Sequence, residues 1–259
     1  MDEEIRKNKR GQIAIWVIVA LALVVVIILF FLLRESVIPD IGGGVSDDPR
    51  GFIDSCVKKH VNDVVDIMLP KGGFIEPEHA KMYNNINISY LCYNRGNYLP
   101  CVNEHPLFLN EMTAEIKDYI TPKVDECFND YKSEMEKRNV GIDLDDDMNL
   151  KVSLGRDRIF VEIEREIIIN ENQDTKEIDD FDIEIISPLY DIGRVAMEIA
   201  SQEAKYCYFE YVGYMILYPE FKIKLDQRAD YSKIYTIEDK ESGKVMNIAI
   251  RSCAIPPGL

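Results

Sequence analysis

The chain has 259 residues, of which 46 are acidic and 30 are basic, so its formal net charge is −16 at pH 7. Residues 1–34 hold 5 basic and 3 acidic residues, which leaves 25 basic and 43 acidic residues, a net charge of −18, in the 225 residues that follow. That charge excludes nucleic acid and anionic lipid as partners held by long-range electrostatics. The length suffices for one or two modest domains with cores of their own.

A run of twenty-one uncharged apolar residues extends from Ile13 to Leu33. As a helix it spans about 31 Å, the thickness of one bilayer core, and it lacks the polar face of a water-soluble helix. Four basic residues lie between positions 6 and 10, whereas only Arg34 lies close on the other side. The positive-inside rule therefore predicts a cytoplasmic N-terminus and an external chain from residue 34 onward.

The same run is too long for a removable secretory signal, whose apolar stretch has about 7–15 residues and ends in small residues at a cleavage site. Here it ends in Phe-Phe-Leu-Leu-Arg. We therefore expect a retained single span at residues 13–33, which makes the lipid bilayer a predicted partner.

Lys9-Arg10-Gly11-Gln12 lies directly before this unbroken apolar segment. The arrangement resembles the class III signal of archaeal type IV pilins and covers about residues 7–33. The resemblance implies cleavage between Gly11 and Gln12 and packing of the mature helix into a filament core. Trp16 departs from it, since many pilins carry Glu at that fifth mature position.

A plain signal anchor is favoured over pilin-like processing, which is the alternative. The N-terminus and the Cys-bearing segment after it also resemble a set of uncharacterised single-pass proteins of small-genome archaea. That second resemblance implies no activity.

A stalk and a first helix are predicted after the span. Pro39 and the glycines at 42–44 indicate a flexible stalk over residues 35–48. Asp48 and Pro49 then supply an N-cap and a first helical position. Apolar residues at three-to-four spacing continue this helix until Pro70.

Residues 74–106 are rich in Pro, Asn and Tyr and are expected to be irregular. They contain the N-glycosylation sequon Asn87-Ile88-Ser89, which is usable if this part of the chain is external. A second helical region is predicted over about 107–138, broken or entered at Pro122.

From about residue 150 the apolar period changes to two, as expected for strands with one buried face. Strands are predicted near 150–154, 159–169, 178–186, 220–226, 233–238 and 245–252, with a helix over 188–210. Residues 154–158 are expected to form the hairpin turn that joins the first two strands. These elements predict an antiparallel sheet covered by one helix, and the chain as a whole is expected to be α+β.

Six cysteines all lie beyond the span, and an even number outside a membrane favours disulfides over buried free thiols, which are the alternative. Fifteen pairings are possible. One pair encloses a short turn-rich loop, one joins two similar helical contexts, and one joins the end of the covering helix to the last strand. The favoured pairs are Cys92–Cys101, Cys56–Cys127 and Cys207–Cys253.

No familiar pattern of a metal or catalytic site is found. The three histidines, His60, His79 and His105, are joined by no HExxH, HxH or spaced Cys pattern, and no Gly-x-Ser-x-Gly elbow occurs. An EF-hand starting at Asp143 fails because Met148 and Leu154 replace its Gly and Glu. We therefore predict no catalytic, metal or cofactor site.

Three further groups of residues could have either a functional or a merely structural role. Glu162, Glu164 and Glu166 are expected on the wet face of a strand rather than as glycosidase carboxylates. A non-EF calcium site at Asp143, Asp145 and Asp147 stays open. Tyrosines between 206 and 218 either pack internally, stack on sugars or form a protein interface.

Together these features predict a non-enzymatic, single-pass cell-surface protein with a structural or interaction role, such as a pilin-like filament subunit. A monomeric binding module for glycan or protein ligands is the alternative, and an extracellular hydrolase comes third. The expected parts are a leader (1–11), a transmembrane helix (12–34), a stalk (35–48), a helical Cys-containing subdomain (49–140) and a sheet domain (141–259).

Overall fold

The computed structural model of the protein describes residue 23 and residues 48–171 and 174–253. The chain divides into two compact units, 1–45 and 46–259. Within the described residues no helix is long and apolar enough to cross a bilayer. The predicted span, apart from Leu23, lies outside the described residues, as do the predicted processing site at Gly11 and Gln12 and the stalk before Asp48.

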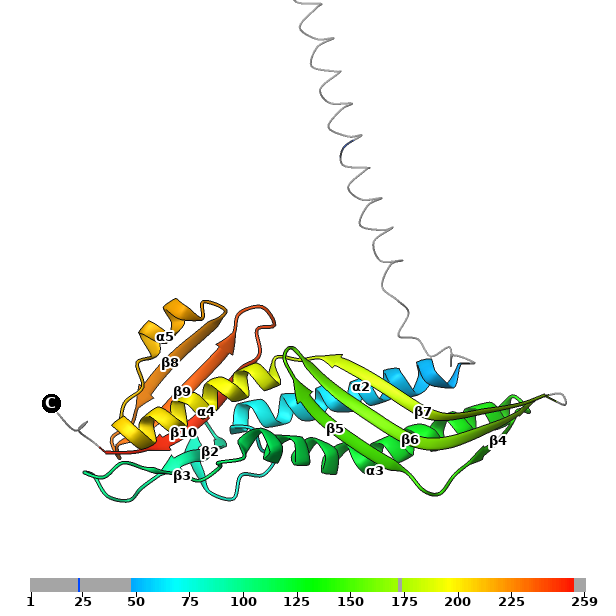
Figure 1. Ribbon diagram of the computed structural model, residues 1–259, viewed down its shortest axis with the longest axis horizontal. Helices are drawn as coiled ribbons and strands as arrows, with labels where there is room; N and C mark the ends of the chain where they lie inside the picture. Colours follow the sequence, from blue (N-terminus) through cyan, green and yellow to red (C-terminus); the bar gives the residue numbers. More distant parts are fainter. Residues whose placement is uncertain (1–22, 24–47, 172–173, 254–259) are drawn as a thin grey trace, which may run out of the picture. The chain divides into compact units, whose positions relative to one another are not determined.

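The second unit is α+β, as predicted, and contains two sheets (Figure 1). Its helices are α2 (Pro49–Met68), the short 3-10 helix η2 (Leu69–Lys71), α3 (Phe108–Lys137), α4 (Leu189–Tyr206) and α5 (Tyr211–Leu217). Its strands are β1 (Ala80–Tyr83), β2 (Ile86–Tyr93), β3 (Val102–Asn103), β4 (Gly141–Leu144), β5 (Asn149–Gly155), β6 (Arg158–Glu171), β7 (Asp174–Ile186), β8 (Phe221–Gln227), β9 (Ser232–Asp239) and β10 (Val245–Arg251).

The four-stranded sheet is antiparallel and is built around β6. β7 pairs along one edge of β6, while β4 and β5 pair with successive parts of the strand. The turn between β5 and β6 contains Asp157 at φ +57°, in the left-handed region that Asp tolerates better than most residues. This is the hairpin that the sequence predicts.

The six-stranded sheet has the order β1-β2-β10-β9-β8, with β3 paired to β2. All its pairings are antiparallel except that of β2 with β10, which is parallel. Its strands come from both predicted parts, 49–140 and 141–259. The predicted single sheet over 141–259 is therefore wrong in its detail, because β4–β7 form one sheet and β8–β10 join another.

Helices α2 and α3 lie side by side and cover the buried face of the four-stranded sheet (Figure 1). The Asp48 carboxylate accepts hydrogen bonds from the amides of Arg50 and Gly51, so the predicted N-cap is present. Both helices bury one stripe at three-to-four spacing. On α3 this stripe comprises Phe108, Met112, Ile116, Ile120, Val124, Cys127, Phe128, Tyr131 and Met135.

Helix α3 runs without a break through Pro122, which contradicts the predicted interruption. Proline lacks the amide proton that would bond to the carbonyl of Asp118. Pro122 is exposed, whereas Val124 and Cys127 continue the buried stripe on its C-terminal side. Packing against α2 and the sheet thus outweighs one missing hydrogen bond.

Helix α4 lies against β2, β9 and β10 and also contacts α3. At the crossing, a Cβ on Gly193 would lie 2.6 Å from the Met112 methyl group, so this position requires glycine for close helix contact. The helix ends at Tyr206 rather than at the predicted residue 210, because Cys207 adopts a left-handed conformation, φ +56°.

Residues 74–106 were predicted to be irregular, but they contain the strands β1, β2 and β3. The central strand β2 is buried from Ile88 to Cys92 and holds its place through β10, which lies more than 150 residues further along the chain. The sequence around β2 does not reveal its pairing with β10. The Asn and Tyr content of residues 74–106 therefore led to the prediction of a loop.

Candidate functional site

The six cysteines form three disulfides, Cys56–Cys127, Cys92–Cys101 and Cys207–Cys253. These are the three pairs favoured by their sequence context. The first joins α2 to α3, the second closes the loop between β2 and β3, and the third ties the end of α4 to the residues after β10. No cysteine of the described chain is free.

One disulfide has a histidine beside it. His60 follows Cys56 by four residues on α2, and one donor atom from each of Cys56, His60 and Cys127 lies within 4.8 Å of the other two. Cys56 and His60 are half-buried and Cys127 is buried. Burial, followed by the positive charge of Lys123, lowers the pKa of His60 and favours its neutral imidazole.

Sequence reasoning overlooked this group. The signal was the spacing of Cys56 and His60, because residues four apart on a helix share one face. The other two histidines are elsewhere: His79 Nδ1 lies 2.7 Å from Glu104 Oε2, and His105 Nδ1 lies 2.5 Å from Glu111 Oε2. Each of these two histidines is thus paired with a glutamate.

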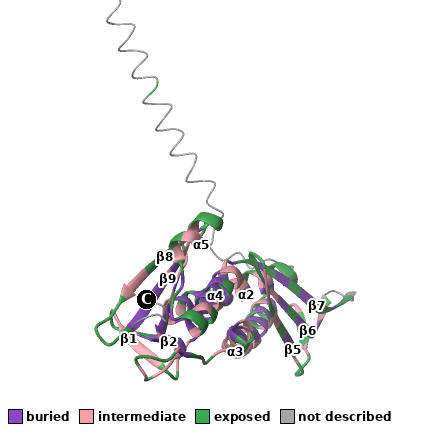
Figure 2. Cartoon of the chain, turned by 60° about the vertical axis from the view of Figure 1, so that its left-hand side comes forward, coloured by how far each residue is buried: buried purple, intermediate pink, exposed green. Residues whose placement is uncertain are grey.

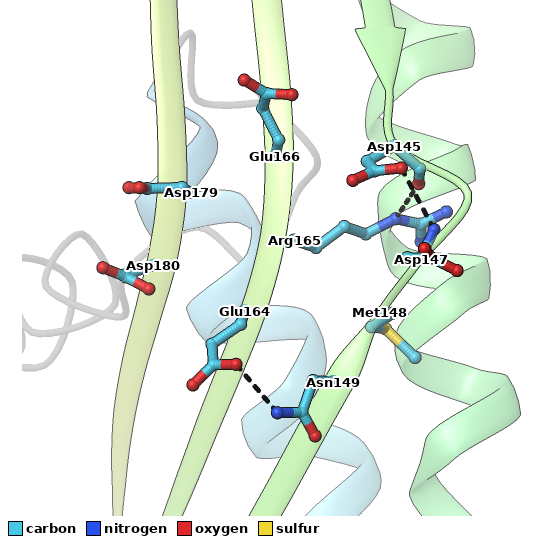
Figure 3. Close-up of a pocket in the computed structure, with 9 residues that line it drawn as sticks. All are labelled: Asp145, Asp147, Met148, Asn149, Glu164, Arg165, Glu166, Asp179 and Asp180. Carbon is cyan, nitrogen blue, oxygen red and sulfur yellow. Dashed lines mark hydrogen bonds between the residues drawn. The ribbon is translucent and has the colours of Figure 1, made fainter.

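A second candidate is an open hollow of about 580 Å³ on the wet face of the four-stranded sheet (Figure 3). It is lined by Asp145, Asp147, Met148, Asn149, Glu164, Arg165, Glu166, Asp179 and Asp180. Its walls are therefore mostly carboxylates, and six of the nine lining residues are acidic.

A bulge in β6 brings these carboxylates together. The register of β6 against β7 shifts between Glu164 and Ile167, where β6 holds one extra residue. As a result Asp179 and Asp180 on β7 are both exposed, although they are adjacent in a strand. The side chain of Arg165, the residue after Glu164 on β6, is buried.

Arg165 is among the residues that line the hollow, but its guanidinium group is bound to other residues. Its Nε donates to the carbonyl oxygen of Asp145 at 2.8 Å (Figure 3). Its Nη1 donates to Asp125 Oδ1 at 2.7 Å. The guanidinium carbon lies 5.0 Å from the ring centre of Phe128 on α3. The guanidinium group of Arg165 therefore links the four-stranded sheet to α3.

The pKa values of two carboxylates in the hollow, Glu164 and Glu166, are shifted in opposite directions. Hydrogen bonds from Asn149 and Lys151 lower the pKa of Glu164, whereas a hydrogen bond shared with Glu177 raises the pKa of Glu166. Glu164 is exposed and Glu166 is half-buried. Glycosidase carboxylates need a cleft that holds a sugar between them, whereas this hollow is open to solvent.

The aspartates considered for calcium are divided between β4 and the loop after it. Asp143 accepts from Asn170, and Asp145 accepts from the amide of Asp147. They do not converge as a group of three donors, since among the described residues the group that does so is Cys56, His60 and Cys127.

The third candidate is the surface of α5, where none of the seven residues is buried (Figure 2). Ile216 and Leu217 are each 76% exposed. We use the name α5 surface for the large exposed side chains on and beside this helix: Tyr206, Tyr208, Val212, Ile216, Leu217 and Tyr218. The predicted tyrosine cluster thus lies mainly outside the core.

The α5 surface is held in place from below. Phe209 is buried, and its ring centre lies 5.3 Å from that of Tyr214, whose pKa burial raises to about 12. Glu210 accepts hydrogen bonds from the Tyr208 hydroxyl and from the amide of Gly213, which fixes the first turn of α5. The apolar side chains are therefore displayed on an ordered support.

The predicted glycosylation position lies on β2. Asn87 is exposed and is paired with Met82 on the edge strand β1, while Ser89 of the same sequon is buried. Modification at Asn87 stays a prediction.

Comparison with protein-family models, with curated proteins and with solved structures found no match.

Proposed function

We propose that the chain is a membrane-anchored, self-associating protein. In this proposal residues 13–33 span the bilayer and the α5 surface contacts a second copy of the chain. The observation that carries this proposal is the exposure of α5. Soluble monomers seldom leave contiguous large apolar side chains in water, and such patches mark interaction sites. Tyrosine in particular is enriched at protein interfaces.

Charge favours a second copy as the occupant. Residues 205–244 contain seven basic and seven acidic residues, so this part of the chain is neutral within an external region of net charge −18. Two copies that meet through the acidic face of the four-stranded sheet would repel each other. Contact through the α5 surface avoids that repulsion and removes Ile216 and Leu217 from water.

A monomeric glycan-binding module is the second candidate, because exposed Tyr206, Tyr208 and Tyr218 supply faces on which sugars stack. The aliphatic pair Ile216 and Leu217 favours a protein partner instead, since aliphatic side chains offer no such face. No reaction is assigned to the chain.

Site-directed cross-linking tests the interface. A photoactivatable amino acid at position 216 of the full chain in membranes is expected to trap a dimer. The matched control is position 99, because Leu99 is also a largely exposed leucine, 62% exposed, but lies in the loop between β2 and β3. Equal cross-linking at both positions, or none at 216, would rule out the proposed interface.

Light scattering provides a second measurement on detergent-solubilised full chain. Ile216→Asp with Leu217→Asp is expected to lower the mass of the assembly, and Leu99→Asp is expected to leave it unchanged. A wild-type chain that is monomeric and cross-links to other surface components would favour the binding-module alternative.

The anchoring part of the proposal is tested separately. Protease added to intact cells is expected to digest residues beyond Arg34 and to spare the N-terminus. N-terminal sequencing then distinguishes a mature chain that begins at Gln12, as pilin-like processing requires, from an anchor that keeps Met1.

A further inference from the structure

The group Cys56, His60 and Cys127 has the donor set of a metal site. Two thiolates and one imidazole are ligands that Zn²⁺ binds, with Zn–S near 2.3 Å and Zn–N near 2.0–2.1 Å. Such bond lengths place the donors of one tetrahedral ion roughly 3.5–3.8 Å apart. The three donors here already lie within 4.8 Å of one another.

The two helices supply the rigidity that a metal site needs. Cys56 and His60 share one face of α2, and Cys127 faces them from α3, with 6.1 Å between the two cysteine Cα atoms. Rotation of each cysteine about its Cα–Cβ bond separates the sulfurs without moving either backbone. The buried stripes of α2 and α3 keep the helices paired meanwhile.

We propose that reduction of the Cys56–Cys127 disulfide creates a three-ligand site for Zn²⁺ or a similar thiophilic divalent cation, completed by His60. A dithiol supplies the two electrons and two protons: it becomes a cyclic disulfide, and Cys56 and Cys127 become thiols. The cation then displaces both thiol protons and accepts the lone pair of His60. A disulfide and a metal centre are thus alternative states of the same side chains.

The surroundings of His60 suit this role. Asp63 Oδ2 lies 4.0 Å from His60 Nδ1, which is too far for a hydrogen bond. A rotation of the Asp63 side chain would let it bond to the ring, as carboxylates commonly do to metal-binding histidines. Lys59 and Lys123 also face the imidazole, and Asp63 and Glu126 offset their charge. Because Cys56 and His60 are half-buried, a fourth ligand from solvent can reach the ion.

The other two disulfides are internal comparators. Neither Cys92–Cys101 nor Cys207–Cys253 belongs to a group of three donors among the described residues. Reduction of the full chain therefore frees six thiols, but only one pair gains an imidazole. A metal ion that needed only two free thiols for binding would bind to all three cysteine pairs.

The experiment uses the full chain in detergent, reduced with a dithiol without oxygen, freed of the dithiol and titrated with Co²⁺ and then Zn²⁺. We expect one equivalent of Co²⁺ with the absorption of tetrahedral thiolate coordination, displaced by Zn²⁺, and none in the oxidised chain. Zn²⁺ is also expected to protect Cys56 and Cys127, but not Cys92, from alkylation in peptide mapping.

Two matched pairs of variants locate the site. His60→Ala and the double change Cys56→Ser/Cys127→Ser are expected to abolish the cobalt spectrum, whereas His79→Ala and Cys92→Ser/Cys101→Ser keep it. Asp63→Asn is expected to weaken binding by about 10-fold. Far-UV circular dichroism reports whether each reduced chain stays folded.

The proposal is overturned by a reduced chain that binds no metal, whether folded or unfolded. It is equally overturned if protection from alkylation is uniform over the six cysteines, or if His60→Ala and His79→Ala bind alike.

Discussion

The two sheets use charge in opposite ways. The four-stranded sheet carries its carboxylates on a wet face, where Glu162 and Glu164 are exposed and where Glu164 and Glu166 line an open hollow. The six-stranded sheet instead buries one carboxylate, Glu203 of α4, which is 0% exposed. The first arrangement needs no partners for its charges, whereas the second depends on them.

Every oxygen of the Glu203 carboxylate is engaged. Lys233 Nζ lies 2.8 and 2.7 Å from its two oxygens and also donates to the carbonyl of Cys207 at 2.7 Å. The Tyr235 hydroxyl donates to the same carboxylate at 2.5 Å, and burial raises the pKa of that hydroxyl. Among the described residues no buried side-chain nitrogen or oxygen lacks a partner. A carboxylate is thus buried here only inside a complete network.

The largest expected effect comes from breaking that network. Glu203→Gln leaves Lys233 buried without a counter-charge and is expected to lower the free energy of unfolding by about 3–5 kcal/mol. Glu164→Gln, on the wet face, is expected to change it by less than about 0.5 kcal/mol. Urea denaturation of the two variants measures the contrast.

A double variant checks the cause. Glu203→Leu with Lys233→Met removes both charges and is expected to be more stable than Glu203→Gln, because no charge is left unpaired. A double variant less stable than the single one would mean that the network contributes more than mutual neutralisation.

The disulfides of the two regions differ in the length of chain that they enclose. Cys56–Cys127 spans 71 residues and Cys92–Cys101 spans 9. In the chain-entropy model their removal costs about 4 and about 2.5 kcal/mol. Paired Cys→Ala variants, unfolded in urea under oxidising conditions, are expected to keep this order, and the reverse order would point to residual structure in the unfolded chain.

Arg165 is the exception on the wet sheet, since it faces inward, and it offers an intermediate effect. Arg165→Met keeps the packing over Phe128 but loses the bonds to Asp145 and Asp125, at an expected cost of about 1–3 kcal/mol. Arg158 lies on the same strand as Arg165 and forms an exposed ion pair with Glu184 of β7, so Arg158→Met is expected to cost only about 0–1 kcal/mol. Equal losses of thermal stability would show that Arg165 acts as a surface residue.

The smallest effects concern pH, and here the two sheets are expected to differ in sign. Burial alone would raise the pKa of Asp230, but hydrogen bonds from Lys81 and Ser232 outweigh it and the pKa is lowered. Its stabilisation is therefore complete above about pH 4 and is lost as the pH falls through the folded-state pKa. Glu166, whose pKa is raised, stabilises the fold below about pH 4 and loses that contribution as the pH rises.

Melting temperatures across the acid range test this difference. Asp230→Asn is expected to lower the melting temperature at neutral pH, with the gap to wild type closing in acid. Glu166→Gln is expected to raise it at neutral pH, with its gap also closing in acid. Gaps that do not change with pH would exclude titration of these two groups as the cause.

Local features of the fold could be predicted from the sequence. The β5–β6 hairpin, the N-cap at Asp48 and the three disulfides follow from spacing and short-range context. The division into two sheets could not be predicted, because it depends on the parallel pairing of β2 with β10. That pairing joins segments over 150 residues apart, and neither strand encodes its partner.

The buried charge network and the candidate sites were predicted less well, for reasons visible in particular residues. Glu203 continues the apolar stripe of α4, one turn after Ile199 and Ala200, which signalled a buried charge. Its partners on β9 lie about 30 residues away and are fixed only by the fold. The tyrosines near α5 were noted, but their exposure depends on α4 ending at Cys207.

The position of β10 has a consequence for how the protein is made. β10 is the last strand of the described residues, and it lies between β2 and β9. A ribosome therefore releases β2 long before the strand that completes it, and until then both neighbours have an open edge able to pair with other chains. The six-stranded sheet can close only after residue 251 is available, so a nascent chain truncated before Val245 lacks its centre rather than its margin.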